Sequence, residues 1–261
     1  MILFSRFSRI FLTSTTLLAF AGLALAQDNL TPRQRQIERE RQRLSSSDIE
    51  ERRDALMKLR SMNHALAARA AVASLNDPEP AVRVTAAHAL RALPGDEAVA
   101  LLAPLTTEKL EFVRREAASA LGDTQRRAAI PTLSTMLADK EPSVRAAAAI
   151  ALGKIGDETA VPALVQVLSG TNKKKREDEF VMRAAADSLG EIKSRAGSLV
   201  LITILSDEAA PVDLRRAAAR SLGLIGDPAA KPALQAASGA ADPYLTEAAR
   251  AALRRLRASG N

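Results

Sequence analysis

The stretch Pro142–Leu164 reads PSVRAAAAIALGKIGDETAVPAL and decides the fold. Within it, Val144, Ala148 and Leu152 recur at intervals of four residues. This spacing places apolar side chains on one stripe of an α-helix, so that the stripe can face a core. The alanines beside them leave room for close contact between helix backbones. The first half of the stretch therefore predicts an amphipathic helix.

The second half of the same stretch predicts a tight turn and another helix. Gly153 and Gly156 stand on either side of an isoleucine, and glycine readily adopts the positive φ found at helix ends. Asp157 can then cap the next helix, and Pro162 suits its first turn because the missing N–H is harmless there. The unit is thus a helix, a turn and a second helix.

Six copies of the Val-Arg-x-x-Ala-Ala phrase, or close variants of it, occur along the chain. The leucines that close them are separated by 31, 31, 37, 33 and 31 residues, at Leu90, Leu121, Leu152, Leu189, Leu222 and Leu253. Such a period is the mark of tandem structural repeats, in which each unit covers the apolar side of its neighbour. We therefore expect one continuous interior shared by all units.

The composition agrees with an all-helical repeat protein. Hydrophobic residues make up 47% of the 261 residues, but aromatic residues only 3%, with no Trp and one Tyr. The apolar residues are mostly Ala and Leu, which favour helices. We expect an all-α solenoid over residues 47–257, built of about six antiparallel helix pairs and a terminal capping helix, with residues 258–261 as a disordered tail.

The repeated pattern, best preserved in Pro142–Leu164, resembles the short HEAT-like repeats of the phycobilisome-lyase type. The resemblance covers residues 47–257 and implies a HEAT/armadillo-like superhelix whose second helices line the concave side. One enzyme of this repeat class, the di-iron deoxyhypusine hydroxylase, holds its metal with His-Glu pairs. Here His64 and His88 are each followed by Ala. We therefore expect no metal site, and we expect no other cofactor.

The first 26 residues are typical of a secretory signal peptide. Arg6 and Arg9 precede an uncharged, largely apolar run, and Ala24-Leu25-Ala26 fits the small-x-small cleavage pattern. A retained membrane anchor is the alternative, but the run is short and contains several Thr and Ser residues. We expect cleavage before Gln27, an exported protein that is periplasmic or secreted, and no stable membrane insertion afterwards.

Residues 27–46 are charged and polar on all sides, so we interpret them as a tether or a solvated helix. Removal of a leader that carries two Arg and no acid lowers the formal charge from +7 to +5. This mild excess, with both signs interspersed, does not favour a dedicated nucleic-acid binder. The absence of Cys excludes disulfides and thiolate chemistry.

Arg83, Arg114 and Arg145 follow the leading Val in three successive units. A phosphate-binding ladder is one interpretation. We favour a structural ladder, in which each Arg pairs with a capping acid of a neighbouring unit, such as Asp157, and sets the register between units. Single-stranded nucleic acid would also need stacking aromatic residues, which are scarce. We expect no nucleic-acid partner.

Two segments depart from the periodic background and are candidates for partner binding. The second helix at 199–205 is apolar all round, where its siblings carry Thr or Gln, so it either presents an apolar patch or is buried more deeply in the stack. The insertion at 170–179 has four bases followed by three acids and is either a solvated spacer or a contact loop. The candidate protein-binding residues are Thr132, Thr135, Gln166, Leu201, Ile204, Lys173, Lys174, Lys175 and Arg176.

No phosphate loop, nucleophile elbow or paired-carboxylate pocket is present in the sequence. We therefore expect a non-enzymatic scaffold or adaptor in the bacterial cell envelope that binds a protein or peptide along its concave face. The alternative is an accessory subunit of an envelope enzyme or of a lyase-like activity. The sequence does not identify the partner, the pathway or the oligomeric state.

Overall fold

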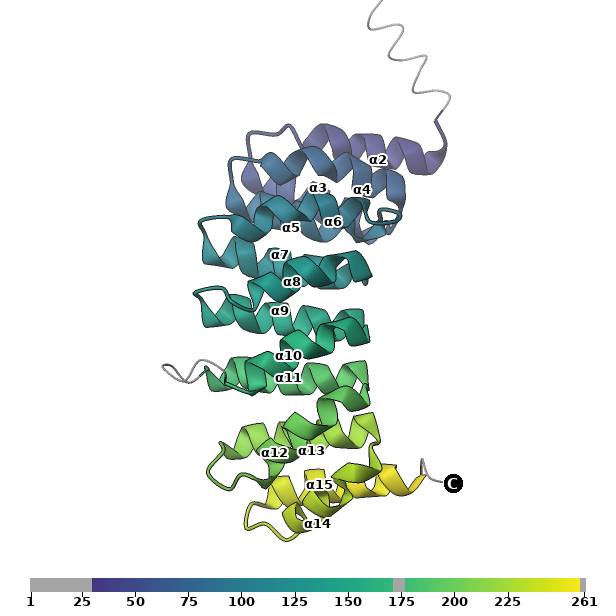
Figure 1. Ribbon diagram of the computed structural model, residues 1–261. Helices are drawn as coiled ribbons and strands as arrows, with labels where there is room; N and C mark the ends of the chain where they lie inside the picture. Colours follow the sequence, from purple (N-terminus) through teal and green to yellow (C-terminus); the bar gives the residue numbers. More distant parts are fainter. Residues whose placement is uncertain (1–29, 171–176, 259–261) are drawn as a thin grey trace, which may run out of the picture.

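The computed structural model describes residues 30–170 and 177–258. Figure 1 shows one elongated stack of helices, from α2 at one end to α15 at the other. No strand occurs among the described residues, so the all-α solenoid is confirmed. None of the helices in these ranges is long and apolar enough to span a membrane.

The helices form two layers, which we call the first and the second helices of each unit. The first helices are α3 (Ile49–Ser61), α5 (Pro80–Ala89), α7 (Glu111–Asp123), α9 (Pro142–Ile155), α11 (Glu179–Ile192), α13 (Val212–Ile225) and α15 (Pro243–Ala258). The second helices are α4 (Ala65–Ala71), α6 (Glu97–Leu102), α8 (Ile130–Met136), α10 (Val161–Leu168), α12 (Ser198–Ser206) and α14 (Lys231–Ala237).

Short 3-10 segments flank these helices in every unit. Some extend a helix at its C-terminal end, namely η1 (Val72–Asn76), η2 (Leu90–Ala92) and η3 (Ala103–Thr107). Others lead into a second helix, namely η4 (Arg127–Ala129), η5 (Glu158–Ala160), η6 (Arg195–Gly197) and η7 (Pro228–Ala230). Helix α15 is the first helix at the C-terminal end of the stack, and no second helix follows it within the described residues.

The predicted stripe forms the core. Val144, Ala148 and Leu152 of α9 are fully buried, and the equivalent residues of the other units join them in a single cluster that extends from Ile37 to Ala252. Each unit thus covers the apolar side of the next, as the repeat period predicted.

The two glycines of the turns after α9 and α13 have different roles. Gly156 adopts φ 72° after α9 and donates its N–H to the carbonyl of Leu152, as a left-handed C-cap does. Gly153, by contrast, is helical and touches the next first helix: an added Cβ would lie 2.7 Å from Ser188 Oγ. The expectation of a positive φ holds for Gly156 and is wrong for Gly153. Gly153 instead allows α9 and α11 to approach closely, because it has no side chain.

The arginine ladder is structural. Arg114 donates from Nε and Nη2 to the two carboxylate oxygens of Asp139, at 2.7 and 2.9 Å, and from Nη1 to the carbonyls of Glu108 and Lys109. These carbonyls lie in the turn before α7, and Asp139 lies in the turn after α8. One buried guanidinium therefore ties together two successive turns.

The same arrangement recurs in neighbouring units, but not with the expected acid. Arg52 pairs with Asp77 and Arg145 with Glu177 in the same manner. Asp157 instead caps its own turn by accepting from the N–H of Thr159. The reason is position, because Arg114 and its equivalents stand at the start of a first helix, whereas Asp157 lies beyond the end of one.

The N-terminal segment is a docked cap. Residues Pro32–Arg43 form α2, whose capping box joins Thr31 and Gln34. Ile37 and Glu40 are buried, and α2 packs against α3 and α4. Residues 32–43 are therefore a helix, as one of the two alternatives had it, but the helix is docked and not solvated on all sides, because Ile37 gives it an apolar contact that its polar composition concealed.

Candidate protein-binding face

Hollows occur between successive first helices on their outward side, which we call the first-helix face. One hollow of about 450 Å³ lies between α9 and α11. Another of about 700 Å³ spans α11, α13 and α15, and a smaller one of about 200 Å³ lies between α7 and α9. Shallow grooves therefore cross the first-helix face between the five successive first helices from α7 to α15.

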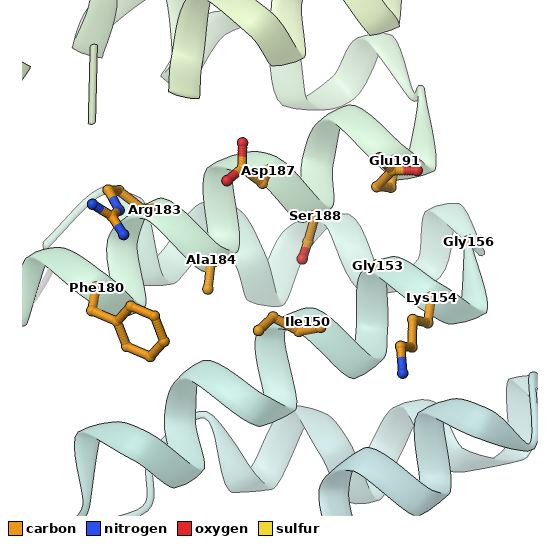
Figure 2. Close-up of a pocket in the computed structure, with 10 residues that line it drawn as sticks. All are labelled: Ile150, Gly153, Lys154, Gly156, Phe180, Arg183, Ala184, Asp187, Ser188 and Glu191. Atoms are coloured by element: carbon orange, nitrogen blue, oxygen red, sulfur yellow. The ribbon is translucent and has the colours of Figure 1, made fainter. Parts of the chain in front are cut away.

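The hollow between α9 and α11 has apolar walls and a charged rim. In Figure 2 the Phe180 ring and the Ile150 side chain reach into it from α11 and α9 respectively. Ala184 lines the floor, while Asp187 and Glu191 of α11 stand at the rim. Phe180 begins this wall because Asp178 caps α11 by accepting from the Phe180 N–H at 2.9 Å, which fixes the start of the helix.

The larger hollow repeats this construction toward the C-terminal end. Tyr244, at the start of α15, borders it together with Leu224 and Ala248. The guanidinium carbon of Arg216 lies 5.0 Å from the centroid of the Tyr244 ring, within cation–π range. Arg216 is itself held by Asp242, so the ring rests on a fixed cation.

Ion pairs on this face join neighbouring first helices. Lys154 pairs with Asp123 at 2.9 Å, Arg220 with Asp187 at 3.1 Å, and Arg183 with Asp213 at 3.7 Å. Most of these groups are half-exposed, so each pair contributes little to stability. Their effect is to leave the face with alternating, mutually compensated charges.

His88 extends the same pattern to α5. Its Nε2 lies 3.2 Å from Glu116 and its Nδ1 lies 3.4 Å from Asp123, both on α7. Burial opposes ionisation of Asp123, but the hydrogen bond and charge of Lys154, with a smaller contribution from His88, outweigh it and lower the pKa of Asp123. Among the residues that the structure describes, no group of three or more His, Cys, Asp or Glu side chains is placed to hold a metal ion.

The predicted apolar patch on α12 is wrong. Leu201 is fully buried and Ile204 is 8% exposed, because both point from α12 into the stack. Leu199, which is 76% exposed, projects outward from the same helix instead. The alternative of deeper burial, left open by the sequence, is the correct one for Leu201 and Ile204.

The other candidates are spread over the second helices. Thr132 is half-buried, and Thr135 is exposed but donates its hydroxyl to the carbonyl of Pro131. Gln166 is exposed on α10. None of these three lines a hollow described above. Lys173, Lys174, Lys175 and Arg176 lie outside the described residues.

Sequence reasoning missed the residues of the first-helix face. The alignment of the repeats could have identified this face. In that alignment, one position is aromatic in three units: Phe112, Phe180 and Tyr244 each stand nine residues before the closing leucine. The low count of aromatic residues was taken as evidence against a nucleic-acid partner, and their placement on the first helices was not considered for a protein partner.

Comparison with known proteins identifies the repeat. The profile of HEAT repeats matches residues 37–122, 111–180 and 173–254. The chain belongs to the HEAT-repeat family. A search of curated proteins finds no match for this HEAT-repeat protein.

Several solved structures show similarity to this HEAT-repeat chain. The complex of CpcE and CpcF of phycocyanin lyase from Nostoc sp. PCC7120 is 25% identical over 89% of each chain, with a TM-score of 0.51. An engineered protein is 21% identical over 85% of this chain and 68% of its own, also with a TM-score of 0.51. Human deoxyhypusine hydroxylase in complex with glycerol is 18% identical over 91% of this chain and 99% of its own, with a TM-score of 0.39.

Proposed function

We propose that this HEAT-repeat protein is a non-enzymatic scaffold of the bacterial cell envelope that binds a protein or peptide along the first-helix face. The observation that carries the proposal is the row of apolar-walled hollows between successive first helices. Grooves of this kind suit an elongated partner better than a small molecule, because they repeat along the stack and remain open to solvent.

The packing of the two layers supports a concave first-helix face, in contrast to the expectation that the second helices line the concave side. Gly122, Gly153, Gly190 and Gly223 bring successive first helices into backbone contact, with added Cβ atoms at 2.7–2.8 Å from the next helix. The second helices contact one another much less. The layer with the smaller spacing lies on the inside of a curve, and inner surfaces of solenoids are extended binding surfaces.

The envelope location rests on the leader in residues 1–26. Its test is the N-terminal sequence of the protein recovered from fractionated bacteria. We expect the chain to begin at Gln27 and to be found outside the cytoplasm. Recovery of the full-length chain in the cytoplasmic fraction would contradict this part of the proposal.

Partner binding is tested by co-purification from envelope extract with two matched variants. The first-helix variant carries Ile150→Asp and Glu191→Lys, and the second-helix variant carries Leu199→Asp and Gln166→Lys. All four positions are exposed, so both variants should fold. We expect the same partner to co-purify with the wild-type protein and the second-helix variant, and to be lost with the first-helix variant; loss with the second-helix variant alone would refute the choice of face.

The second candidate function is an accessory subunit of an envelope enzyme. The structural likeness to CpcE and CpcF, a complex within phycocyanin lyase, favours it. It predicts that the co-purified partner is an enzyme whose turnover falls when this chain is removed. A scaffold predicts that turnover by the partner is unaffected.

A further inference from the structure

The three aromatic residues in the described part of the chain share one structural position. Phe112, Phe180 and Tyr244 are the second residues of α7, α11 and α15, which are alternate first helices. They are 38%, 51% and 72% exposed respectively. We call them the aromatic row.

The fold does not require aromatic side chains at this position. The intervening helices α9 and α13 carry Ser143 and Asp213 there, and α5 carries Ala81. All of these helices pack in the same manner, so the rings add little to the core. Large exposed apolar side chains cost solubility and mark interaction sites when they are grouped on one face.

Further apolar side chains extend the same face. Ile150 shares the hollow with Phe180, and Leu224 shares the next one with Tyr244. Ala184 and Ala248 line the grooves beside Phe180 and Tyr244, so side chains of a partner can reach the helix backbones there. Phe180 and Tyr244 thus border a shallow apolar track along the stack, and Phe112 lies exposed at the same helix position on α7.

The charges beside this track indicate the chemistry of its occupant. Lys154, Arg220 and Arg183 are each paired with an acid of a neighbouring first helix. A polyanion or a polybasic peptide would have to break these pairs to gain new ones. A segment with few charges and with apolar anchor side chains can bind without breaking these ion pairs. It is therefore the complementary partner.

The spacing of the aromatic row matches an extended polypeptide. Packed helices lie about 8–10 Å apart, so rings on alternate helices are about 16–20 Å apart. An extended chain covers that distance in about six residues, an even number that returns anchor side chains to the same side.

Polar side chains favour an extended chain over a helix as the occupant. Ser119, Asp187 and Arg220 stand seven residues after the position of the aromatic row. The mutual ion pair of Arg220 and Asp187 uses one N–H and one carboxylate oxygen, so both side chains keep further donor and acceptor sites. They can bond the backbone amides that an extended segment leaves open without breaking the pair, whereas a helix satisfies its own amides. Resting on the proposed function, we propose that the first-helix face binds an extended, weakly charged segment of a partner protein whose apolar anchor residues are about six positions apart and contact Phe112, Phe180 and Tyr244.

The test uses a phage-displayed library of random peptides of about 16 residues, long enough for three anchors six positions apart. The mature chain is the bait, and a variant with Phe112→Ser, Phe180→Ser and Tyr244→Ser is the comparison. Ser already occupies this position in α9, so the variant should keep the helical circular dichroism spectrum and the urea midpoint of the wild type. Leu199→Ser, on α12, is the matched control for loss of an exposed apolar side chain.

We expect enrichment of peptides with few charges and with aromatic, aliphatic or proline residues six positions apart. Synthetic copies should bind the wild type and Leu199→Ser equally, and should bind each single Ser variant of the aromatic row about tenfold more weakly. Failure to enrich any peptide, enrichment of strongly charged or helical peptides, or equal affinity for the triple variant would overturn the inference. If the peptide experiment gives one of these negative results but the first-helix variant still loses the natural partner in co-purification, this inference is refuted and the proposed scaffold function is not.

Discussion

Gly153 shows how one missing methyl group sets the distance between two units. A Cβ at this position would lie within 3 Å of the Cα and Cβ of Ser188, and these two atoms cannot move without shifting α11. We expect Gly153→Ala to lower the free energy of unfolding by about 1–3 kcal/mol, the usual cost of overpacking. Urea denaturation followed by circular dichroism measures this change.

Gly239 supplies the control for the same substitution. A Cβ there would meet only the carbonyl oxygen of Ala236, at 3.7 Å, in ordinary contact. Gly239→Ala should therefore change the free energy of unfolding by less than about 0.5 kcal/mol. Equal effects of the two substitutions would show that the contact with α11 accommodates a methyl group and does not restrict Gly153.

At the scale of the element, α12 has one face in the core and one in solvent although nearly all its side chains are apolar. Leu201→Asp places a carboxylate in the core and should destabilise the protein by about 3 kcal/mol or more. Leu199→Asp, two residues earlier on the outer side, should change stability by less than about 0.5 kcal/mol. Thermal unfolding of the two variants decides the matter, and similar melting temperatures would mean that α12 is oriented differently.

This helix also shows where sequence reasoning stops. In α9 the spacing of Val144 and Leu152 identifies the buried stripe, because the same two positions hold Val or Leu in all six copies of the repeated phrase. In α12 the run Leu199–Leu205 has Thr203 as its only polar residue, so periodicity predicts a helix without its orientation. Orientation there depends on neighbouring units, which only the assembled stack reveals.

The candidate site follows the same logic. The repeat and its two layers were predictable because the closing leucines recur in every unit and turn glycines recur in several of them. The face that receives a partner was not, because it depends on which layer packs closely, and that is decided by contacts such as Gly153 with Ser188 between units. The aromatic residues were visible in the sequence, but their alignment matters only once Phe180 and Ile150 are seen to share a hollow.

At the scale of the whole molecule, the arginine ladder makes stability depend on pH. The hydrogen bond from Arg114 of the ladder lowers the pKa of Asp139. That from Arg216, which stands one residue after the ladder position in α13 but also pairs with an acid between two units, lowers the pKa of Asp242. Such carboxylates are more acidic in the folded than in the unfolded state. Their contribution is therefore fully present above the ordinary pKa of Asp, about 4, and is lost as the pH falls through the lower folded value.

Each of these acids stands at a turn between units, so protonation loosens contacts along the whole stack rather than at one place. We expect the urea midpoint to be nearly constant from pH 7 to pH 5 and to fall below about pH 4. Asp139→Asn should lower the midpoint at pH 7 and flatten its dependence on pH, because the group that titrates is gone. Glu208→Gln, which removes an exposed carboxylate with no ion pair among the described residues, should leave both unchanged. A midpoint that drops equally on acidification in the wild type and in Asp139→Asn would show that other carboxylates, not the ladder, hold the units together.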